Sequence, residues 1–219
     1  MDACRIELTR DGSPTLYRPD IDEHYHSTYG ALSESRYVYI KAALLFKASL
    51  TTVRPLRVFE VGLGTGLNAV LAAMTNLEID YEAIEKYPLN INLISKLNFG
   101  NEIDRNILES IHSAQWEKGV TITPTFFIKK RKVDLITHKT EKLFDVIFMD
   151  AFAPDKQPEM WSQPVLKHLA SLLAPGGVMT TYCAKGHIRR SFQSLGLLPE
   201  RLPGPPAGKR EILRLTKPL

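Results

Sequence analysis

Apolar and polar residues alternate near the start of the chain. The alternation covers residues 6–19 and is interrupted by Asp11-Gly12, a pair typical of tight turns, so a β-hairpin is predicted there. A helical pattern follows, for which Ser33 or Ser35 is a suitable cap. Its apolar face would consist of Tyr37, Ile40, Leu44 and Leu45. Together these elements predict an N-terminal extension over residues 1–52, packed on the rest of the chain.

From residue 53 onward, strand-like and helix-like patterns alternate. The predicted strands are 57–61, 79–85, 122–136 (long enough to include a hairpin), 144–150, 177–183 and 210–217. The predicted helices are 67–75, 88–97 (opened by Pro88), 163–173 (ended by the 174–177 stretch APGG) and 186–196. Such alternation indicates an α/β fold, an open and mostly parallel sheet with helices on both faces. We expect one core over residues 53–219, with the last strand at an edge.

The composition is that of a globular protein, with 44% hydrophobic and 24% charged residues among 219. No apolar run is long enough to span a bilayer, and the polar, charged start predicts no secretory leader. Cys4 and Cys183 are far apart and are predicted to be free thiols in a reducing cytoplasm. The net charge of +4 fits an anionic macromolecular partner or simply a slightly basic enzyme.

The most regular motif is Gly62-Leu63-Gly64-Thr65-Gly66, between a predicted strand and a predicted helix. Glycines with this spacing allow a tight turn and a close approach of the backbone to a ligand. The motif lacks the GK[ST] ending of a phosphate-binding P-loop. Glu85 follows nineteen residues after Gly66, where a carboxylate can bind both ribose hydroxyls of an adenosine. This arrangement fits NAD and S-adenosylmethionine equally well.

Two further acidic residues bear on that choice. Glu60 lies within the first core strand, where a carboxylate would repel a pyrophosphate but suit the ammonium group of a methionine, directly or through water. The alternative is that Glu60 pairs with a nearby Lys or Arg. Asp134 follows the third strand region, where it is a candidate acceptor for an adenine amino group or a plain surface residue.

The strand 144–150 leads into the most informative stretch of the chain, which contains Asp150, Phe152 and Trp161. Ligand sites of open parallel sheets lie at the carboxyl ends of the strands, so Asp150 should face the glycine loop. A carboxylate beside an aromatic ring suits amine chemistry, since the carboxylate can orient an amine and accept its proton. The alternatives are that Asp150 only caps a turn and that Trp161 belongs to the core.

Five stretches together carry a resemblance: EVGLGTGLN (60–68), IEKYPL (84–89), DAFAPDKQPEMW (150–161), AKGHIRRSFQ (184–193) and GKREIL (208–213). The chain resembles the methyltransferase part of the MnmC family, the tRNA 5-methylaminomethyl-2-thiouridine biosynthesis proteins. YHSTYGALSESRYVYI (25–40) is similar to that family's N-terminal segment. Two positions differ from the family pattern: Ala151 replaces a glycine, and Pro205-Pro206-Ala207 replaces a basic, aromatic run.

The resemblance implies a class I, Rossmann-like methyltransferase that uses S-adenosylmethionine to methylate the amine of 5-aminomethyl-2-thiouridine at the tRNA wobble position. Asp150 would be catalytic. The cofactor would be held by Glu60, Gly62, Gly64, Gly66, Asn68, Glu85, Lys86, Asp134 and Asp150. The implied partners are the anticodon loop of tRNA and a separate FAD-dependent oxidase, with no membrane. Bifunctional members continue into that oxidase, and since this sequence ends at Leu219, we expect no oxidase activity from it. An NAD-dependent oxidoreductase and a methyltransferase for a small-molecule amine remain alternatives.

Substrate contacts are expected from aromatic and basic residues. The candidates are Tyr25, Tyr29, Phe152, Arg189, Arg190, Lys209 and Arg210. A wobble base must leave its stack to react, and aromatic rings commonly hold such a base. The basic run 129–132 is a weaker candidate, because charge runs are usually solvated faces. His24 and His26 are catalytic candidates, but their tyrosine-rich context favours hydrogen-bonded structural roles.

Overall fold

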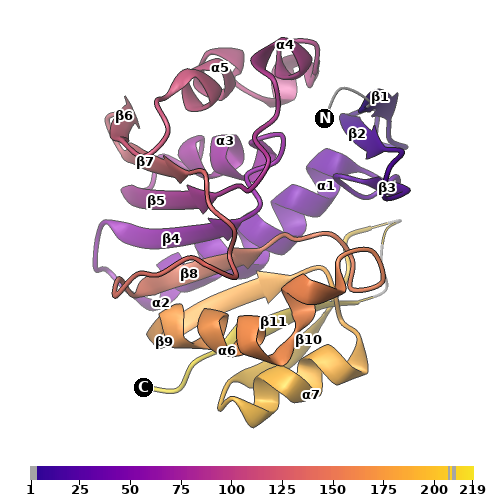
Figure 1. Cartoon of the computed structure of the whole chain (residues 1–219). Coiled ribbons are helices and arrows are strands. Elements are labelled where there is room, and N and C mark those ends of the chain that lie inside the picture. Colours follow the sequence, from indigo (N-terminus) through magenta and orange to yellow (C-terminus); the bar gives the residue numbers. More distant parts are fainter. Residues whose placement is uncertain (1–3, 207, 209–210) are drawn as a thin grey trace.

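The centre of the molecule is an eight-stranded sheet with the strand order β10-β11-β9-β8-β4-β5-β7-β6. The computed structural model describes residues 4–206, 208 and 211–219 (Figure 1). The strands of the sheet are β4 (Leu56–Val61), β5 (Ile79–Ile84), β6 (Gly119–Thr123), β7 (Phe126–Arg131), β8 (Phe144–Met149), β9 (Leu173–Thr181), β10 (Leu198–Pro203) and β11 (Glu211–Thr216). The five neighbouring strands β7, β5, β4, β8 and β9 run parallel, and the outer pairings β6–β7, β9–β11 and β11–β10 are antiparallel, which confirms the predicted α/β fold.

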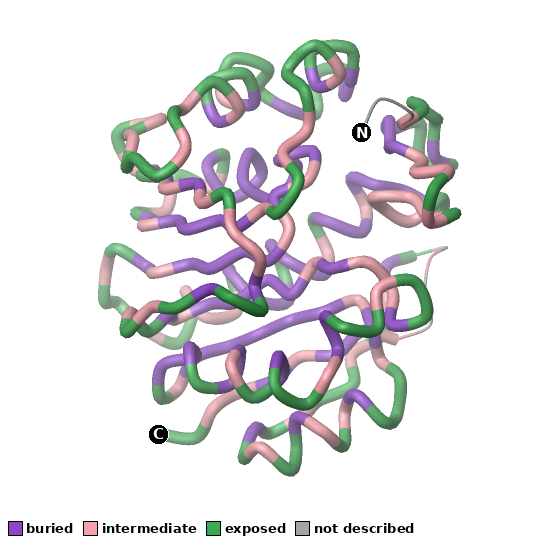
Figure 2. The backbone as a smooth tube through the Cα atoms, viewed as in Figure 1, coloured by how far each residue is buried: buried purple, intermediate pink, exposed green. Residues whose placement is uncertain are grey.

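Helices cover both faces of this sheet, because apolar side chains of the inner strands alternate between the two faces. The helices are α1 (Ala31–Ser35), the π-helix η1 (Arg36–Leu45), α2 (Phe46–Leu50), α3 (Leu67–Ala73), α4 (Ile91–Ile94), α5 (Arg105–Ser113), α6 (Gln163–Leu172) and α7 (Gly186–Ser194), with short 3₁₀ turns η2 (Gly100–Glu102) and η3 (Pro158–Trp161). Val58 packs on the side of η1, α3 and α5, whereas Phe59 and Val61 pack on the side of α6 and α7. Figure 2 shows the resulting buried centre.

A second, three-stranded sheet precedes the core. It contains β1 (Arg5–Leu8), β2 (Pro14–Arg18) and β3 (Glu23–His24), and the pairing of β1 with β2 confirms the predicted hairpin. Figure 1 shows this sheet beyond the carboxyl ends of β4 and β5. The helical segment 31–50 shares one apolar cluster with the central sheet. The division of the chain at residue 52 stays a prediction.

Several predicted elements differ from the observed ones. The helix predicted to open at Pro88 is only the short α4, which begins after Asn90, whose side chain accepts a hydrogen bond from the Asn92 backbone. Neither Ser33 nor Ser35 caps a helix with its side chain; Ser35 stands at the N-cap position of η1 without a capping hydrogen bond, and Ser33 Oγ donates to Asp11. The helical face was wrong at Leu45, which is exposed because the wider turn of the π-helix shifts the positions of the side chains.

Other differences concern elements near the ends of the core. The last strand, β11, is not an edge strand, since it lies between β9 and the unpredicted β10. α5 and β3 were also missed. The stretch APGG does not separate a helix from a strand, because β9 already begins at Leu173. No helix formed by the described residues is long and apolar enough to cross a membrane.

Candidate active site

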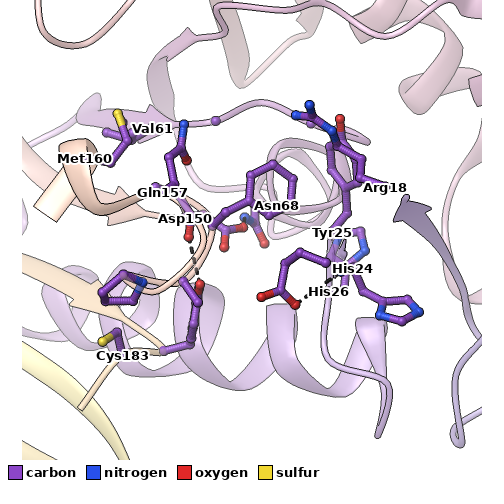
Figure 3. A pocket seen from close by; sticks show the side chains of 18 of the residues that line it. Arg18, His24, Tyr25, His26, Val61, Asn68, Asp150, Gln157, Met160 and Cys183 are labelled. Atoms are coloured by element: carbon purple, nitrogen blue, oxygen red, sulfur yellow. Dashed lines mark hydrogen bonds between the residues drawn. The ribbon is translucent and has the colours of Figure 1, made fainter. Parts of the chain in front are cut away.

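A cavity of about 570 Å³ lies at the carboxyl ends of the parallel strands. The loops after β4, β5 and β8 form its floor, and the segment 23–29 of the small sheet and its following turn closes it from the other side. Figure 3 shows Asn68 and Asp150 near the centre, with Arg18, Tyr25 and His26 on one side and Met160 and Cys183 on the other. Residues far apart in the sequence thus line one site.

The glycine loop forms one wall of the cavity. Gly62 and Gly64 line it with φ angles of +84° and +49°, which an L side chain rarely adopts. A Cβ on Gly62 would lie 2.9 Å from the Asp150 carbonyl oxygen, so glycine is required for the approach of the two loops. Gly66 lies outside the cavity lining at the N-terminus of α3, where a Cβ would lie 2.7 Å from His112 Nε2. Gly66 therefore serves helix packing.

Glu85 lies at the end of β5 and lines the same cavity. Its carboxylate accepts hydrogen bonds from the backbone N–H of Gly64 at 3.1 Å and of Tyr87 at 2.9 Å. Burial raises the pKa of Glu85, and these backbone donors partly offset the shift. The arrangement holds the carboxylate against the glycine loop, in the place expected for a ribose acceptor.

Asp150 lies directly after β8, and its carboxylate is held from two other elements. Tyr39 Oη in η1 donates to Oδ1 at 2.7 Å, and Asn68 Nδ2 in α3 donates to Oδ2 at 2.7 Å. Both donors are distant from Asp150 in the sequence, so the side chain does more than cap the turn that follows β8. The carboxylate lines the cavity in one fixed orientation.

Glu60 lies behind Asn68, outside the cavity lining. Its side chain is fully buried, does not line the cavity, and accepts a hydrogen bond from Asn68 Nδ2 at 3.0 Å. Burial and the charge of Asp150 raise the pKa of Glu60 well above its usual range. Among the described residues, no Lys or Arg forms an ion pair with Glu60, so the alternative of a simple salt bridge was wrong. Any influence of Glu60 on a ligand passes through Asn68.

An aromatic wall completes the site. The rings of Tyr25 and Phe152 meet edge to face with centroids 5.2 Å apart, and the Arg18 guanidinium lies 5.5 Å from the Phe152 centroid. Trp161 Nε1 donates to the Phe152 carbonyl at 2.8 Å, and Tyr182 Oη donates to the Ala151 carbonyl at 2.8 Å. Trp161 is thus a buried anchor for the loop that presents Phe152.

The two histidines have structural contacts. His26 shares hydrogen bonds with Thr15 Oγ1 and Thr65 Oγ1, each at 3.1 Å, and so joins the small sheet to the glycine loop. Burial lowers its pKa to about 4, so the ring is neutral near pH 7. His24 Nε2 lies 2.9 Å from Glu7 Oε2. These contacts agree with the structural alternative.

The remaining candidates divide into three groups. Lys86 and Asp134 line the cavity and pair with each other at 2.8 Å, and Tyr29 lines its rim. Arg189 and Arg190 lie on α7, outside the cavity lining. Lys209 and Arg210, like Ala207 of the departure from the family pattern, lie outside the described residues.

The basic run 129–132 is not a continuous charged patch. Lys130 is buried and donates to the His112 carbonyl at 2.7 Å. Arg131 pairs with Glu82 at 2.6 Å. The strand alternation of β7 therefore turns these charges to different sides.

Sequence reasoning missed Tyr39, Glu34 and Tyr182. Glu34 and Tyr182 line the cavity, and Tyr39 binds Asp150. The only signal for Glu34 and Tyr39 was their place in the stretch 25–40, which is one of the stretches that resemble the family. Nothing in local periodicity distinguishes Tyr39 from Tyr37, since only the packing of η1 determines which ring meets Asp150.

The residues present fit a bound S-adenosylmethionine. Glu85 presents a carboxylate for ribose hydroxyls, and Asn68 Oδ1 is buried beside the cavity with no hydrogen-bond partner among the described residues. The Asn68 nitrogen already contacts two carboxylates, so its oxygen is the atom left to accept a bond from an ammonium group. Gly62 and Gly64 allow the backbone to approach a ligand.

Comparison with known proteins agrees with this geometry. A family model described as S-adenosyl-L-methionine-dependent methyltransferase matches residues 106–218. A tRNA 5-methylaminomethyl-2-thiouridine biosynthesis bifunctional protein MnmC from Pseudomonas savastanoi pv. phaseolicola is 30% identical over 97% of this chain and 34% of that protein. The chain thus spans about a third of the length of this curated relative.

Solved structures show the same fold. The crystal structure of MnmC2 from Aquifex aeolicus superposes with a TM-score of 0.81 at 24% identity, covering 99% of this chain and 71% of that one. The N-methyltransferase NodS from Bradyrhizobium japonicum gives a TM-score of 0.50 at 17% identity, with coverages of 80% and 93%.

These findings decide between the two cofactors that the glycine loop left open. The methyl donor is S-adenosylmethionine, and the NAD-dependent oxidoreductase considered as an alternative is wrong. With the family model covering more than half of its residues, this chain belongs to the S-adenosyl-L-methionine-dependent methyltransferases.

Proposed function

We propose that this methyltransferase acts on the primary amine of 5-aminomethyl-2-thiouridine at the wobble position of tRNA. The observation that carries the proposal is the Asp150 carboxylate in a cavity that also contains the Tyr25–Phe152 pair. The name of the curated relatives supports it, since 5-methylaminomethyl-2-thiouridine would be the product.

Different residues of the cavity would bind the cofactor, accept the proton and favour the amine substrate. Gly62, Gly64 and Glu85 hold S-adenosylmethionine, which when bound supplies an electrophilic methyl group. Asp150 accepts a hydrogen bond from the substrate amine, directs its lone pair and takes up the proton that the nitrogen loses on methylation. Glu34, a buried acidic residue of the lining, would favour an amine over an anion.

The substrate base would be held by the aromatic wall. A nucleotide that leaves its stack can rest against Tyr25 and Phe152, while Arg189, Arg190, Lys209 and Arg210 contact phosphates of the anticodon loop. We also propose a cytoplasmic location, because Cys4 and Cys183 are too few and too far apart in the sequence to indicate the disulfide framework of an exported protein. A separate FAD-dependent oxidase is its proposed second partner.

The decisive experiment is methyl transfer to total tRNA from cells that lack the modification, followed by nucleoside analysis. We expect 5-methylaminomethyl-2-thiouridine with the wild-type protein. Asp150→Ala should bind S-adenosylhomocysteine but lose roughly 10²–10⁴-fold in rate, the usual contribution of a positioned acid or base. Glu141→Ala removes an exposed carboxylate and should keep full activity.

Two results would contradict the proposal. Full transfer by Asp150→Ala would refute the role of Asp150. Methylation of free small amines but not of tRNA would favour the small-molecule alternative.

A further inference from the structure

We infer that Tyr39 is a positioning residue for Asp150: with Asn68, it holds both carboxylate oxygens so that the group faces the amine in one orientation. The inference rests on the proposed role of Asp150. Neither the family model nor the names of the relatives assigns a role to Tyr39.

Tyr39 and Asn68 form a clamp, in which each donates a hydrogen bond to a different oxygen of Asp150. Tyr39 Oη lies 2.7 Å from Oδ1, and Asn68 Nδ2 lies 2.7 Å from Oδ2. Both donors are anchored in turn. The Tyr39 ring packs on Phe148 with centroids 5.3 Å apart, and Asn68 also donates to Glu60 at 3.0 Å.

The direction of both hydrogen bonds is defined by chemistry. The Asn68 amide lies between two carboxyl groups, so its NH₂ group must face them. Burial and the negative charge of Asp150 raise the pKa of Tyr39 well above its ordinary value, and its hydroxyl therefore keeps the proton that it donates. Hydrogen bonds to a charged acceptor are stronger than neutral ones.

Tyr39 acts through Asp150 rather than on a ligand. Its side chain is 1% exposed and does not line the cavity. It lies in a π-helix of ten residues, Arg36–Leu45, in the middle of a segment that is otherwise α-helical. π-helical turns are rare and occur frequently at functional sites.

Other ionisable groups surround Asp150 and influence its protonation. They are Glu60 in β4, Tyr81 in β5 and Tyr182 after β9, each of which interacts electrostatically with Asp150, and Glu34 in α1, which interacts with Tyr39. The carboxylates among them disfavour a negative charge on Asp150, so the two donors of the clamp oppose this effect. Removal of one donor should allow Asp150 to bind a proton at a higher pH.

The test is Tyr39→Phe, with Tyr37→Phe as the matched control, since Tyr37 is a half-buried tyrosine of the same helix whose ring lies 5.3 Å from Lys41 Nζ. We expect Tyr39→Phe to lower kcat about tenfold and to move the low-pH break of kcat upward by about one unit, the effect of one charge-assisted hydrogen bond. The KM for S-adenosylmethionine should change less than about twofold. Tyr37→Phe should match the wild type.

The outcomes separate this inference from the proposed function. If Asp150→Asn keeps wild-type activity, the role of Asp150 itself fails. If Asp150→Asn is inactive but Tyr39→Phe has a wild-type kcat and pH profile, only the inference fails. A lower melting temperature without a shifted pH profile would also overturn it, by assigning Tyr39 a purely structural role.

A second variant covers the case in which Tyr39→Phe does not fold. Asn68→Ser removes the other donor of the clamp, and the low-pH break should again move upward. An unchanged break in Asn68→Ser would contradict the clamp.

Discussion

Backbone groups hold the Glu85 side chain in place before any ligand arrives. Both of its oxygens accept N–H groups, one from the glycine loop and one from Tyr87, so the carboxylate is preorganised against Gly64. Preorganisation reduces the entropy lost on binding. Glu85 is therefore expected to contribute mainly to cofactor affinity.

Glu85→Ala should weaken the binding of S-adenosylhomocysteine about tenfold or more, because bonds from ribose hydroxyls to a charged acceptor are lost. Isothermal titration calorimetry measures this directly. Glu78→Ala, an exposed carboxylate just before the same strand, should bind normally. Equal affinities for the two variants would rule out a ribose contact by Glu85.

The lowered pKa of His26 predicts that the protein becomes less stable in acid. Its folded pKa of about 4 lies below the ordinary 6.5, so the unfolded chain binds the proton first as the pH falls. Unfolding therefore becomes easier between about pH 6.5 and about pH 4, by about 3 kcal/mol at most. His112, with a pKa also near 4, adds a similar contribution.

His26→Asn should unfold more easily than the wild type at pH 7, because the link between Thr15 and Thr65 is weakened. It should lose less stability than the wild type between pH 7 and pH 4.5. Urea unfolding at the two pH values gives both numbers. An identical loss in both proteins would mean that His26 does not titrate in this way.

At the scale of elements, the contact between α3 and α5 depends on one position. Gly66 caps the start of α3 with a φ of +76°, and His112 Nε2 of α5 donates a hydrogen bond to the Thr65 carbonyl oxygen at 2.9 Å. A side chain at Gly66 would lie where this imidazole is. The third glycine of the motif thus joins two helices.

Gly66→Ala should therefore be destabilised by more than backbone strain alone. Gly196→Ala is the matched control, because Gly196 has a φ of +84° and open space around it. Both variants carry the left-handed cost of about 1–2 kcal/mol, and Gly66→Ala should lose at least about 1 kcal/mol more through overpacking. Urea unfolding checks the difference, and equal losses would show that α5 adjusts freely.

At the scale of the whole molecule, the small N-terminal sheet closes the site that the central sheet opens. Tyr25 and His26 reach across to Phe152 and Thr65, so the cavity requires both parts of the chain. α7 lies beside it, and neither Arg189 nor Arg190 forms an ion pair with another described residue. The proposed function assigns these two cations to phosphates of the anticodon loop.

Arg189→Ala/Arg190→Ala should weaken tRNA binding and reduce the slope of log K against log salt by about 1–2, because up to two phosphate contacts are lost. Lys139→Ala/Lys167→Ala removes the same charge from exposed positions outside the cavity lining and should leave both values nearly unchanged. Filter binding at several salt concentrations measures them. The same slope in the two double variants would exclude α7 from the interface.

Much of the fold could be predicted from local pattern. The alternation of strands and helices, the hairpin at Asp11-Gly12 and the glycine loop follow from spacing that each segment carries by itself. β10 was missed because Leu198 to Pro203 is mostly polar or exposed, and it forms only by pairing with β11. Because of that pairing, β11 is the second strand of the sheet rather than its edge strand.

The residues of the candidate site also include some that local pattern predicted and some that it did not. The positions of Asp150, Glu85, Gly62 and Gly64 at one cavity were predictable, because the carboxyl ends of parallel strands meet at one edge of the sheet. The surroundings of Glu60 and Tyr39 were not predictable. The burial of Glu60 behind Asn68 and the side of η1 on which Tyr39 lies both depend on long-range packing.

The sequence alone therefore determined the α/β class, the glycine loop after the first core strand, and the placement of Glu85 and Asp150 at the carboxyl ends of neighbouring strands, because these depend on residue types at short spacing. Only the tertiary structure decided which side chains surround that carboxylate. Tyr39, Asn68 and Asp150 come from three separate elements, and their hydrogen bonds exist only after those elements have packed together.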